Sequence, residues 1–302
     1  MSSLSSEWYI EEPLTKTSNF NAASQAYNNG RLALDGSRYL DLTFRPCLDV
    51  INSIGVLPFG VSMKLRFHKA SSRFCLMSSA DMQDYYLQIQ DINVEARFVN
   101  PVPELRSSLT RQMEKQLYFP IVRNEVMERS LSSGVTTIYE SAILKGALPK
   151  QFCVYLLSDA QRAGAYDQNP FSIVPRGLTT IQAYINGQAY PGESGLHVSD
   201  NYLEMARAFQ YFLSNANVPD DENIGLTVQS YTEGNAIFCF DLTPLMNNSS
   251  VFQQELEGEI SLKLSFKDPV GAGLKMMVHA VYDNAIIISQ NAREIETVGY
   301  NS

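Results

Sequence analysis

Apolar and polar residues alternate along much of this chain, so that every second residue is apolar. The pattern runs without a break through residues 60–68, where the apolar members are Val61, Met63, Leu65 and Phe67. Successive side chains of a β-strand point to opposite faces, so this alternation predicts a strand with one buried and one exposed face. Residues 259–267 repeat the pattern and predict a second strand of the same kind.

Several other segments also have the pattern of strands. Residues 86–99 alternate in two phases that change at Gln90–Asp91, as a β-bulge would produce. Residues 179–190 predict a hairpin that turns at Asn186–Gly187. Residues 274–289 predict a last long strand that Asp283–Asn284 interrupts. The remaining predicted strands are residues 39–44, 74–77, 117–131, 152–157 and 236–242.

Two segments have the longer period of a helix. In residues 103–116, Pro103 suits a first helical turn, and three apolar residues follow at intervals of four. Residues 202–213 predict the better helix, with Ser199 or Asp200 as its N-cap. Residues 158–177 between these segments predict a long loop.

Taken together, the segments predict an all-β chain of antiparallel jelly-roll sandwiches, with about ten strands and one or two short helices in inserted loops. At about 150 residues per domain, the 302 residues suggest two domains. Residues 100–103, which contain two prolines, are the best candidate for the boundary between them.

Composition indicates a protein that packs and associates. Charged residues make up 18% of the chain, which is below the usual value of roughly 25% and suggests that other protein covers part of the surface. Tyrosine and phenylalanine are abundant, and both are favoured at interfaces. The net charge of −9 does not favour nucleic-acid binding, because affinity for phosphate comes mostly from Lys and Arg. No apolar run reaches the roughly 18 residues of a membrane span, so none is expected.

The four cysteines are Cys47, Cys75, Cys153 and Cys239, and their spacing matches no zinc site. The last three lie within apolar runs, which predicts buried free thiols and a reducing compartment.

The sequence offers no constellation of catalytic residues. The three histidines are far apart, and neither a phosphate-binding P-loop nor a nucleophile elbow occurs. Asp241 ends an apolar strand, where a carboxylate more often caps a turn than takes part in catalysis. We therefore predict no enzyme activity and no catalytic, cofactor-binding or metal-binding residues; an enzyme on a cupin-like fold fails on the histidine spacing.

Seven segments resemble the hexon-like double jelly-roll major capsid proteins of Polinton (Maverick) elements and adintoviruses. Their order and rough spacing agree with that family from about residue 31 to residue 296. The segments are residues 60–77, 86–97, 144–150, 169–171, 185–188, 238–244 and 281–284.

The resemblance implies a capsid subunit with an incomplete first roll, because little sequence precedes the strand that ends at Phe67. It divides the chain into a polar arm (1–36), a partial first jelly roll (37–102), a second jelly roll (103–296) and a tail (297–302). It also implies a homotrimer within an icosahedral shell in a virion assembled inside the host cell. Expected partners are a penton or minor capsid protein and a second chain that completes the first roll.

A non-catalytic β-sandwich that binds a glycan or a receptor is the alternative function. The aromatic loops at 158–177 and 190–202 favour it. In either case we expect an interface at exposed aromatic residues, with Tyr166, Phe171 and Tyr190 as candidates.

Overall fold

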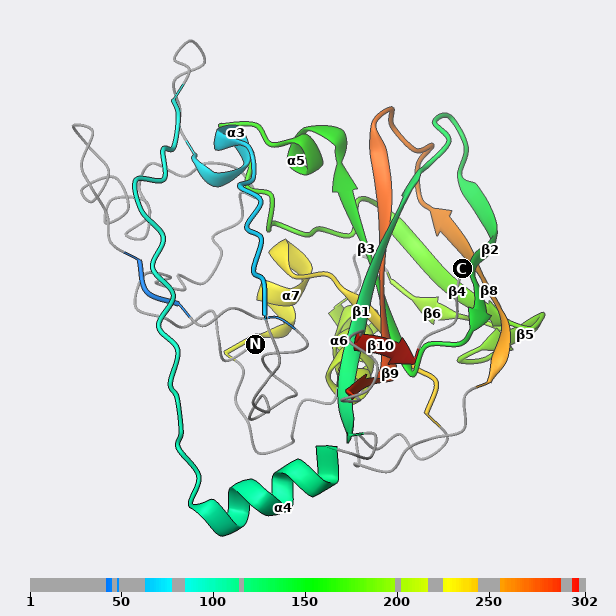
Figure 1. Cartoon of the computed structure of the whole chain (residues 1–302). Helices are drawn as coiled ribbons and strands as arrows, with labels where there is room; N and C mark the ends of the chain where they lie inside the picture. Colours follow the sequence, from blue (N-terminus) through cyan, green and yellow to red (C-terminus); the bar gives the residue numbers. More distant parts are fainter. Residues whose placement is uncertain are drawn as a thin grey trace.

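The computed structural model contains two antiparallel β-sheets that face each other (Figure 1). The first sheet holds, in spatial order, β1 (Leu117–Ser130), β9 (Leu274–Ile288), β3 (Gln151–Ser158) and β7 (Phe238–Asp241), and β10 (Ile295–Val298) also pairs with β9. The second holds β2 (Thr137–Ala147), β8 (Glu257–Phe266), β4 (Leu178–Ile185) and β5 (Gln188–Tyr190), and β6 (Leu196–His197) also pairs with β4. The structure describes residues 42–44, 48, 63–77, 85–113, 117–198, 202–216, 225–243, 256–288 and 295–298.

The order of the strands defines a jelly roll. Apart from the short β6 and β10, the two sheets contain eight strands, and these pair in a nested way: first with last, second with seventh, third with sixth, and fourth with fifth. Such an arrangement is a long antiparallel hairpin rolled up across two sheets, which is the jelly-roll topology. The predicted all-β jelly-roll fold is therefore confirmed, and one complete roll lies within residues 117–288.

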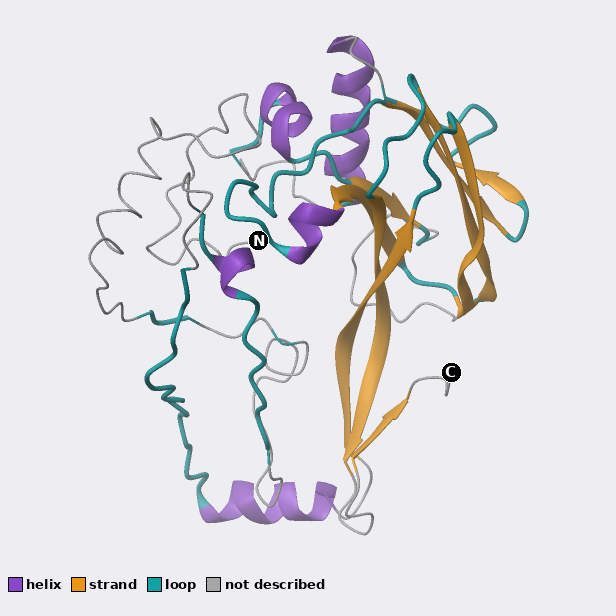
Figure 2. Cartoon of the chain, turned by 90° about the horizontal axis from the view of Figure 1, so that it is seen from above, coloured by secondary structure: helices purple, strands orange, loops and turns teal. Residues whose placement is uncertain are grey.

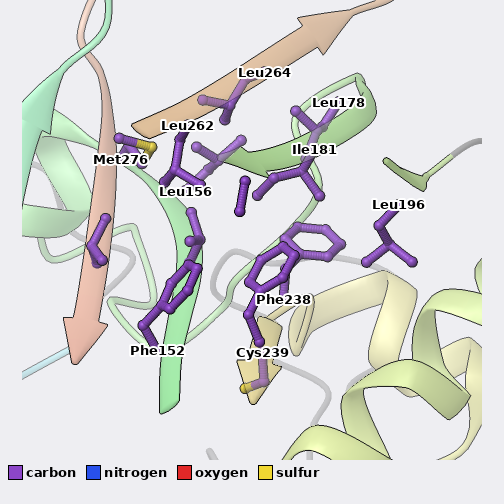
Figure 3. Packing of buried hydrophobic residues seen from close by; sticks show 14 of the residues in the cluster. Phe152, Leu156, Leu178, Ile181, Leu196, Phe238, Cys239, Leu262, Leu264 and Met276 are labelled. Atoms are coloured by element: carbon purple, nitrogen blue, oxygen red, sulfur yellow. The ribbon is translucent and has the colours of Figure 1, made fainter. Parts of the chain in front are cut away.

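The core between the sheets follows the alternation in the sequence. Along β8, Ile260, Leu262, Leu264 and Phe266 are buried, as their spacing predicts. Phe152 and Phe240, from the neighbouring strands β3 and β7, stack with their ring centroids 4.9 Å apart. Figure 3 shows these strands contributing to one packed cluster. Each fully buried side chain of this size contributes about 1.5–3 kcal/mol.

The predicted hairpin turn and the two predicted helices are present in the structure. The β4–β5 hairpin turns at Asn186 and Gly187, which both have positive φ, as a type I′ turn requires. The helices predicted at 103–116 and 202–213 are present as α4 (Pro103–Met113) and α6 (Tyr202–Asn215). The proposed caps of α6, Ser199 and Asp200, lie outside the described residues.

Three short helices were not predicted. They are α3 (Ser72–Cys75), α5 (Asp159–Ala163) within the predicted long loop, and α7 (Val228–Gly234). Capping boxes begin two of them, at Ser158 with Gln161 and at Thr227 with Ser230. The described residues therefore hold five helices rather than one or two.

The strands predicted before residue 103 are wrong where the structure describes them. Residues 63–70 and 85–102 have no regular structure, and α3 occupies part of 74–77. Within the predicted strand at 39–44, only residues 42–44 are described, and they form no strand. A strand is maintained by hydrogen bonds to a neighbour, and these segments have no ladder partner among the described residues. The division of the chain into an arm, two rolls and a tail stays a prediction.

Two differences concern the C-terminal strands. β9 continues through Asp283 and Asn284, because Val122 and Ile121 of β1 pair with them. β10 crosses the predicted boundary at residue 296 between the second roll and the tail, and it pairs with the end of β9. β3 pairs with residues 274–281 of β9 and β10 with residues 285–288, so the β1–β9 ribbon extends past β3 (Figure 2).

The prediction of buried free thiols is wrong for three cysteines. Cys153 of β3 and Cys239 of β7 are direct cross-strand partners, with Cα atoms 4.1 Å apart, and they form a disulfide. Cys75 is free but exposed, and Cys47 lies outside the described residues. Spacing along the sequence does not reveal a pair that only the register of two strands brings together. With this disulfide, the argument from free thiols for a reducing compartment no longer holds.

Candidate assembly interface

A stretch of chain that precedes the jelly roll is attached to the loop after β3. We call this contact the seam; its two sides are residues 69–77 with 85–87, and residues 163–171. In Figure 1, α3 lies beside α5 at this point. Phe74 meets Phe171 edge-on with ring centroids 5.9 Å apart, and Tyr85 meets Tyr166 in the same way at 5.8 Å. The hydroxyl of Tyr166 also donates to the backbone oxygen of Tyr85 at 2.7 Å.

Gly164 allows the closest approach within the seam. A Cβ atom at this position would lie 2.6 Å from the backbone nitrogen of Phe74, and the residue has a φ of 91°. Backbone this close leaves no room for any side chain, and the positive φ independently favours glycine. Gly164 also ends α5, where its N–H donates to the backbone oxygen of Ala160. The seam therefore depends on a single residue type at this position.

Polar contacts hold the N-terminal side of the seam together. The amino group of Lys69 donates to the backbone oxygen of Leu87 at 2.7 Å, and the N–H of Leu87 donates to the Ser72 hydroxyl at 3.1 Å. These bonds join residues 69–72 to residues 85–87 across the intervening stretch. The guanidinium of Arg73 lies 5.8 Å from the ring centre of Tyr166, within the range of a cation–π contact.

The loop on the other side of the seam is fixed by a buried glutamine. Gln161 is 1% exposed, and its side-chain nitrogen donates to the backbone oxygens of Asn169 (3.0 Å) and Ser172 (2.8 Å). Its side-chain oxygen accepts from Arg176 at 2.6 Å. Burial lowers the pKa of Arg176, because a low-dielectric environment disfavours its charged form. This network presents Tyr166 and Phe171 on a constrained loop.

Large exposed apolar side chains line the segment between the seam and the jelly roll. Phe98 is 91% exposed, and no strand neighbour covers the segment among the described residues. Apolar side chains gathered on one exposed segment are typical of an interaction surface. The exposed members between residues 86 and 105 are Tyr86, Ile89, Ile92, Val94, Phe98, Val99, Val102 and Leu105.

The three candidate interface residues lie in two places. Tyr166 and Phe171 are both in the seam, and Phe171 remains 66% exposed despite its contact with Phe74. Tyr190 lies elsewhere, at the end of β5, where its hydroxyl donates to the backbone oxygen of Asp241. Burial raises the pKa of Tyr190, and the nearby charge of Asp241 adds to the shift. That these residues contact another chain stays a prediction.

Asp241 caps a turn, as its position at the end of an apolar strand predicts. It is 2% exposed, and one of its carboxylate oxygens accepts from the N–H of Thr243 at 2.8 Å. Its own N–H donates to the side-chain oxygen of Asn215 at 3.0 Å, which links β7 to the end of α6.

Sequence reasoning missed Gly164, Ser72 and Lys69 as members of the seam. A glycine after the short α5 suggests a helix end but says nothing of a partner 90 residues earlier. Within the described residues, no group of three or more His, Cys, Asp or Glu side chains is placed to hold a metal ion. None of the described helices is long and apolar enough to cross a membrane.

The chain has only distant similarity to the known proteins that it matches. No protein family profile matches it. An uncharacterised protein of Caenorhabditis elegans is 23% identical over 251 residues, which cover 78% of this chain and 58% of that relative. The chain thus spans less than two thirds of that relative's length.

Two solved structures of viral particles show a partial likeness. A chain of the PBCV-1 virus capsid is similar with a TM-score of 0.38 and 10% identity, over 65% of this chain and 54% of that one. A chain of the Sputnik virophage is similar with a TM-score of 0.37 and 10% identity, over 62% of this chain and 40% of that one. The strand order alone defines the jelly roll in this chain.

Proposed function

We propose that this chain is a structural subunit of a viral or virus-derived capsid, of the hexon-like double jelly-roll type. The observation that carries the proposal is a complete jelly roll preceded by a strand-patterned apolar segment that has no strand neighbour among the described residues. The roll supplies a rigid building block, and the segment supplies a surface that another chain can cover. In this proposal the chain carries no catalytic residue.

The sequence resemblance supports the same function at two points of the fold. Residues 185–188 form the β4–β5 turn, and residues 238–244 contain β7 and the turn capped by Asp241. Both segments thus occupy positions that shape the roll. The likeness to Polinton and adintovirus proteins is the basis for proposing this branch of capsid proteins in particular.

The proposed partner is a chain that supplies strands beside residues 86–99. Backbone groups of an extended segment need hydrogen-bond partners once water is excluded, and a neighbouring strand provides them. We place the subunit in a homotrimer, with penton or minor capsid proteins as further partners in a virion assembled within the host cell. An assembly of this kind buries more than roughly 2,000 Å² per interface and is apolar at its centre.

Native mass spectrometry and negative-stain imaging of the full chain test the proposal. We expect trimers or multiples of them that grow with concentration into larger shells or sheets. A chain that stays monomeric at every concentration and salt would contradict the proposal. Binding of that monomer to a glycan array would favour the sandwich binding module instead.

A matched pair of variants locates the interface. Replacing Ile92, Val94 and Phe98 by serine should abolish assembly, because it removes the apolar surface of the unpaired segment. The control replaces three comparably exposed apolar residues outside that segment by serine: Tyr139, Tyr202 and Leu256. Equal loss of assembly in both variants would show that the segment is not the interface.

A further inference from the structure

Three residues in one row of the first sheet combine a disulfide with an imidazole. The strand register places His279 of β9 directly beside Cys153 of β3, and Cys153 directly beside Cys239 of β7. The neighbours Phe152 and Phe240 point into the core, so alternation places the two sulfur atoms on the outer face of the sheet. In Figure 3 the side chains of Cys239 and Phe238 leave β7 in different directions, and both residues belong to the buried cluster.

The two cysteine residues differ in burial. Cys239 is 2% exposed, whereas Cys153 is only partly buried. A thiol from solution therefore reaches the sulfur of Cys153 first. Cys239 is then the leaving group, and its burial keeps it close to Cys153 for the reverse reaction.

His279 is placed to act on Cys153. Directly opposed residues of antiparallel strands have Cβ atoms about 4.5–5.5 Å apart, within reach of an imidazole and a thiol. One ring nitrogen of His279 lies 3.1 Å from the side-chain oxygen of Asn124, which orients the ring. A histidine beside a cysteine favours the thiolate, the reactive form in thiol–disulfide exchange.

Other ionisable groups share this face by register and alternation. Glu128 and Lys275 form an ion pair with each other, and Asp283 pairs with Lys150. None of these four groups lies in the cross-strand row that holds His279 and the disulfide. Further ionisable members of this face are Tyr155 of β3, Asp241 of β7 and, farther along β1, Tyr118.

We propose that Cys153–Cys239 is a thiol–disulfide exchange site for small monothiols such as glutathione, and that His279 positions and stabilises Cys153 in its reactive form. This site does not depend on the proposed capsid function. The thiolate of one glutathione attacks the Cys153 sulfur, a mixed disulfide forms, and Cys239 leaves as a thiolate that takes up a proton.

A second glutathione thiolate completes the cycle. It attacks the glutathione sulfur of the mixed disulfide, glutathione disulfide leaves, and Cys153 departs as a thiolate beside His279. Two thiols are thereby oxidised to one disulfide, and the protein disulfide takes up the two electrons and two protons. Glutathione disulfide drives the reverse sequence.

Exchange at this site would break the covalent link between β7 and β3. Among the described residues β7 pairs with β3 alone, over four residue pairs, and α6 packs against it. The disulfide also joins positions 86 residues apart in the chain. Reduction should therefore loosen the unit made of β7 and α6 and leave the rest of the roll in place.

The first test uses the unmodified full chain in glutathione buffers of graded ratio, with alkylation and peptide mass spectrometry as the readout. We expect Cys153 and Cys239 to convert reversibly together, with glutathione trapped on Cys153 and not on Cys239. Two free thiols in fully oxidising buffer, or a disulfide that exchanges only after denaturation, would overturn the proposal.

The second test measures the alkylation rate of reduced Cys153 against pH, with the exposed thiol of Cys75 as an internal reference. We expect Cys153 to react at lower pH than Cys75. His279→Asn should shift the Cys153 profile to higher pH and reduce its rate near neutrality about tenfold. Cys75 should be unaffected, as should Cys153 in the control variant His197→Asn on the other sheet.

The comparison of the two thiols in the unmodified chain needs no variant, so it stands even if His279→Asn does not fold. A folded His279→Asn protein with an unchanged Cys153 profile would exclude the role of the histidine. The role of the histidine would also be excluded if Cys153 of the unmodified chain did not react at lower pH than Cys75.

Discussion

Gly164 is the residue at which the N-terminal segment and the jelly roll come closest. We expect Gly164→Ala to release residues 71–77 from the loop, because the added Cβ would overlap the backbone of Phe74. The roll itself should keep its core. Limited proteolysis should then cut near residue 74 markedly faster than in the unmodified chain.

Gly271→Ala is the matched control for this change. A Cβ at Gly271 meets nothing within 4 Å and its φ is not positive, so the proteolysis pattern should not change. Unchanged cleavage in Gly164→Ala would mean that the seam does not hold in solution.

Glu128 should make stability depend on acid pH. Hydrogen bonds from Lys275 and then from Arg162, whose Nε lies 2.7 Å away, hold the pKa of its carboxyl below the usual 4.5. A group with a lowered pKa contributes stability above its unfolded pKa, and this contribution is lost as pH falls through the folded value. Thermal unfolding below about pH 4.5 should therefore show a loss that Glu128→Gln removes.

The exposed Glu193 provides the control, since Glu193→Gln should retain the full acid dependence of the unmodified chain. Lys275 has its pKa raised by the same ion pair, so its share is lost only as pH rises above its ordinary value of 10.5. An identical acid profile in Glu128→Gln and in the unmodified chain would rule out this ion pair as a source of stability.

At the scale of elements, α5 depends on its capping box. Ser158 accepts from the N–H of Gln161, whose side chain in turn accepts from the N–H of Ser158. Ser158→Ala should lower the free energy of unfolding by about 1 kcal/mol, the usual cost of a lost N-cap. Denaturant unfolding measures this cost, and the exposed Ser133→Ala should change it by less than about 0.5 kcal/mol. Equal losses of unfolding free energy in the two variants would show that the Ser158 cap does not stabilise the protein.

The elements also show what sequence patterns can and cannot predict. β8 and the β4–β5 hairpin were predictable because their signals, alternation and an Asn–Gly turn, are local. Residues 63–68 carry the same alternation and form no strand, because a pattern states which face is apolar but does not supply a neighbour. Tyr166 and Phe171 could be chosen from the sequence because they are aromatic residues in a predicted loop, whereas Gly164 and the cysteine pair depend on contacts between distant segments.

At the scale of the whole molecule, a complete jelly roll follows a long segment that has no strand neighbour among the described residues. Every strand of the jelly roll has a hydrogen-bonded neighbour in one of the two sheets, whereas residues 85–102 have no regular structure and present exposed apolar side chains. If assembly adds strands beside this segment, its amides gain the strand partners that they lack among the described residues. Hydrogen exchange reports this change directly, because an amide exchanges slowly only when its bond is closed.

We therefore expect amides of residues 88–99 to exchange fast in the isolated subunit and at least about tenfold more slowly in the assembled particle. Amides of β8 serve as the control, because they lie in a central strand between β2 and β4 and should be protected in both states. Protection of residues 88–99 already in the monomer would mean that the chain completes this sheet by itself. Fast exchange in both states would place the interface elsewhere, with the exposed ring of Phe171 at the seam as the next surface to test.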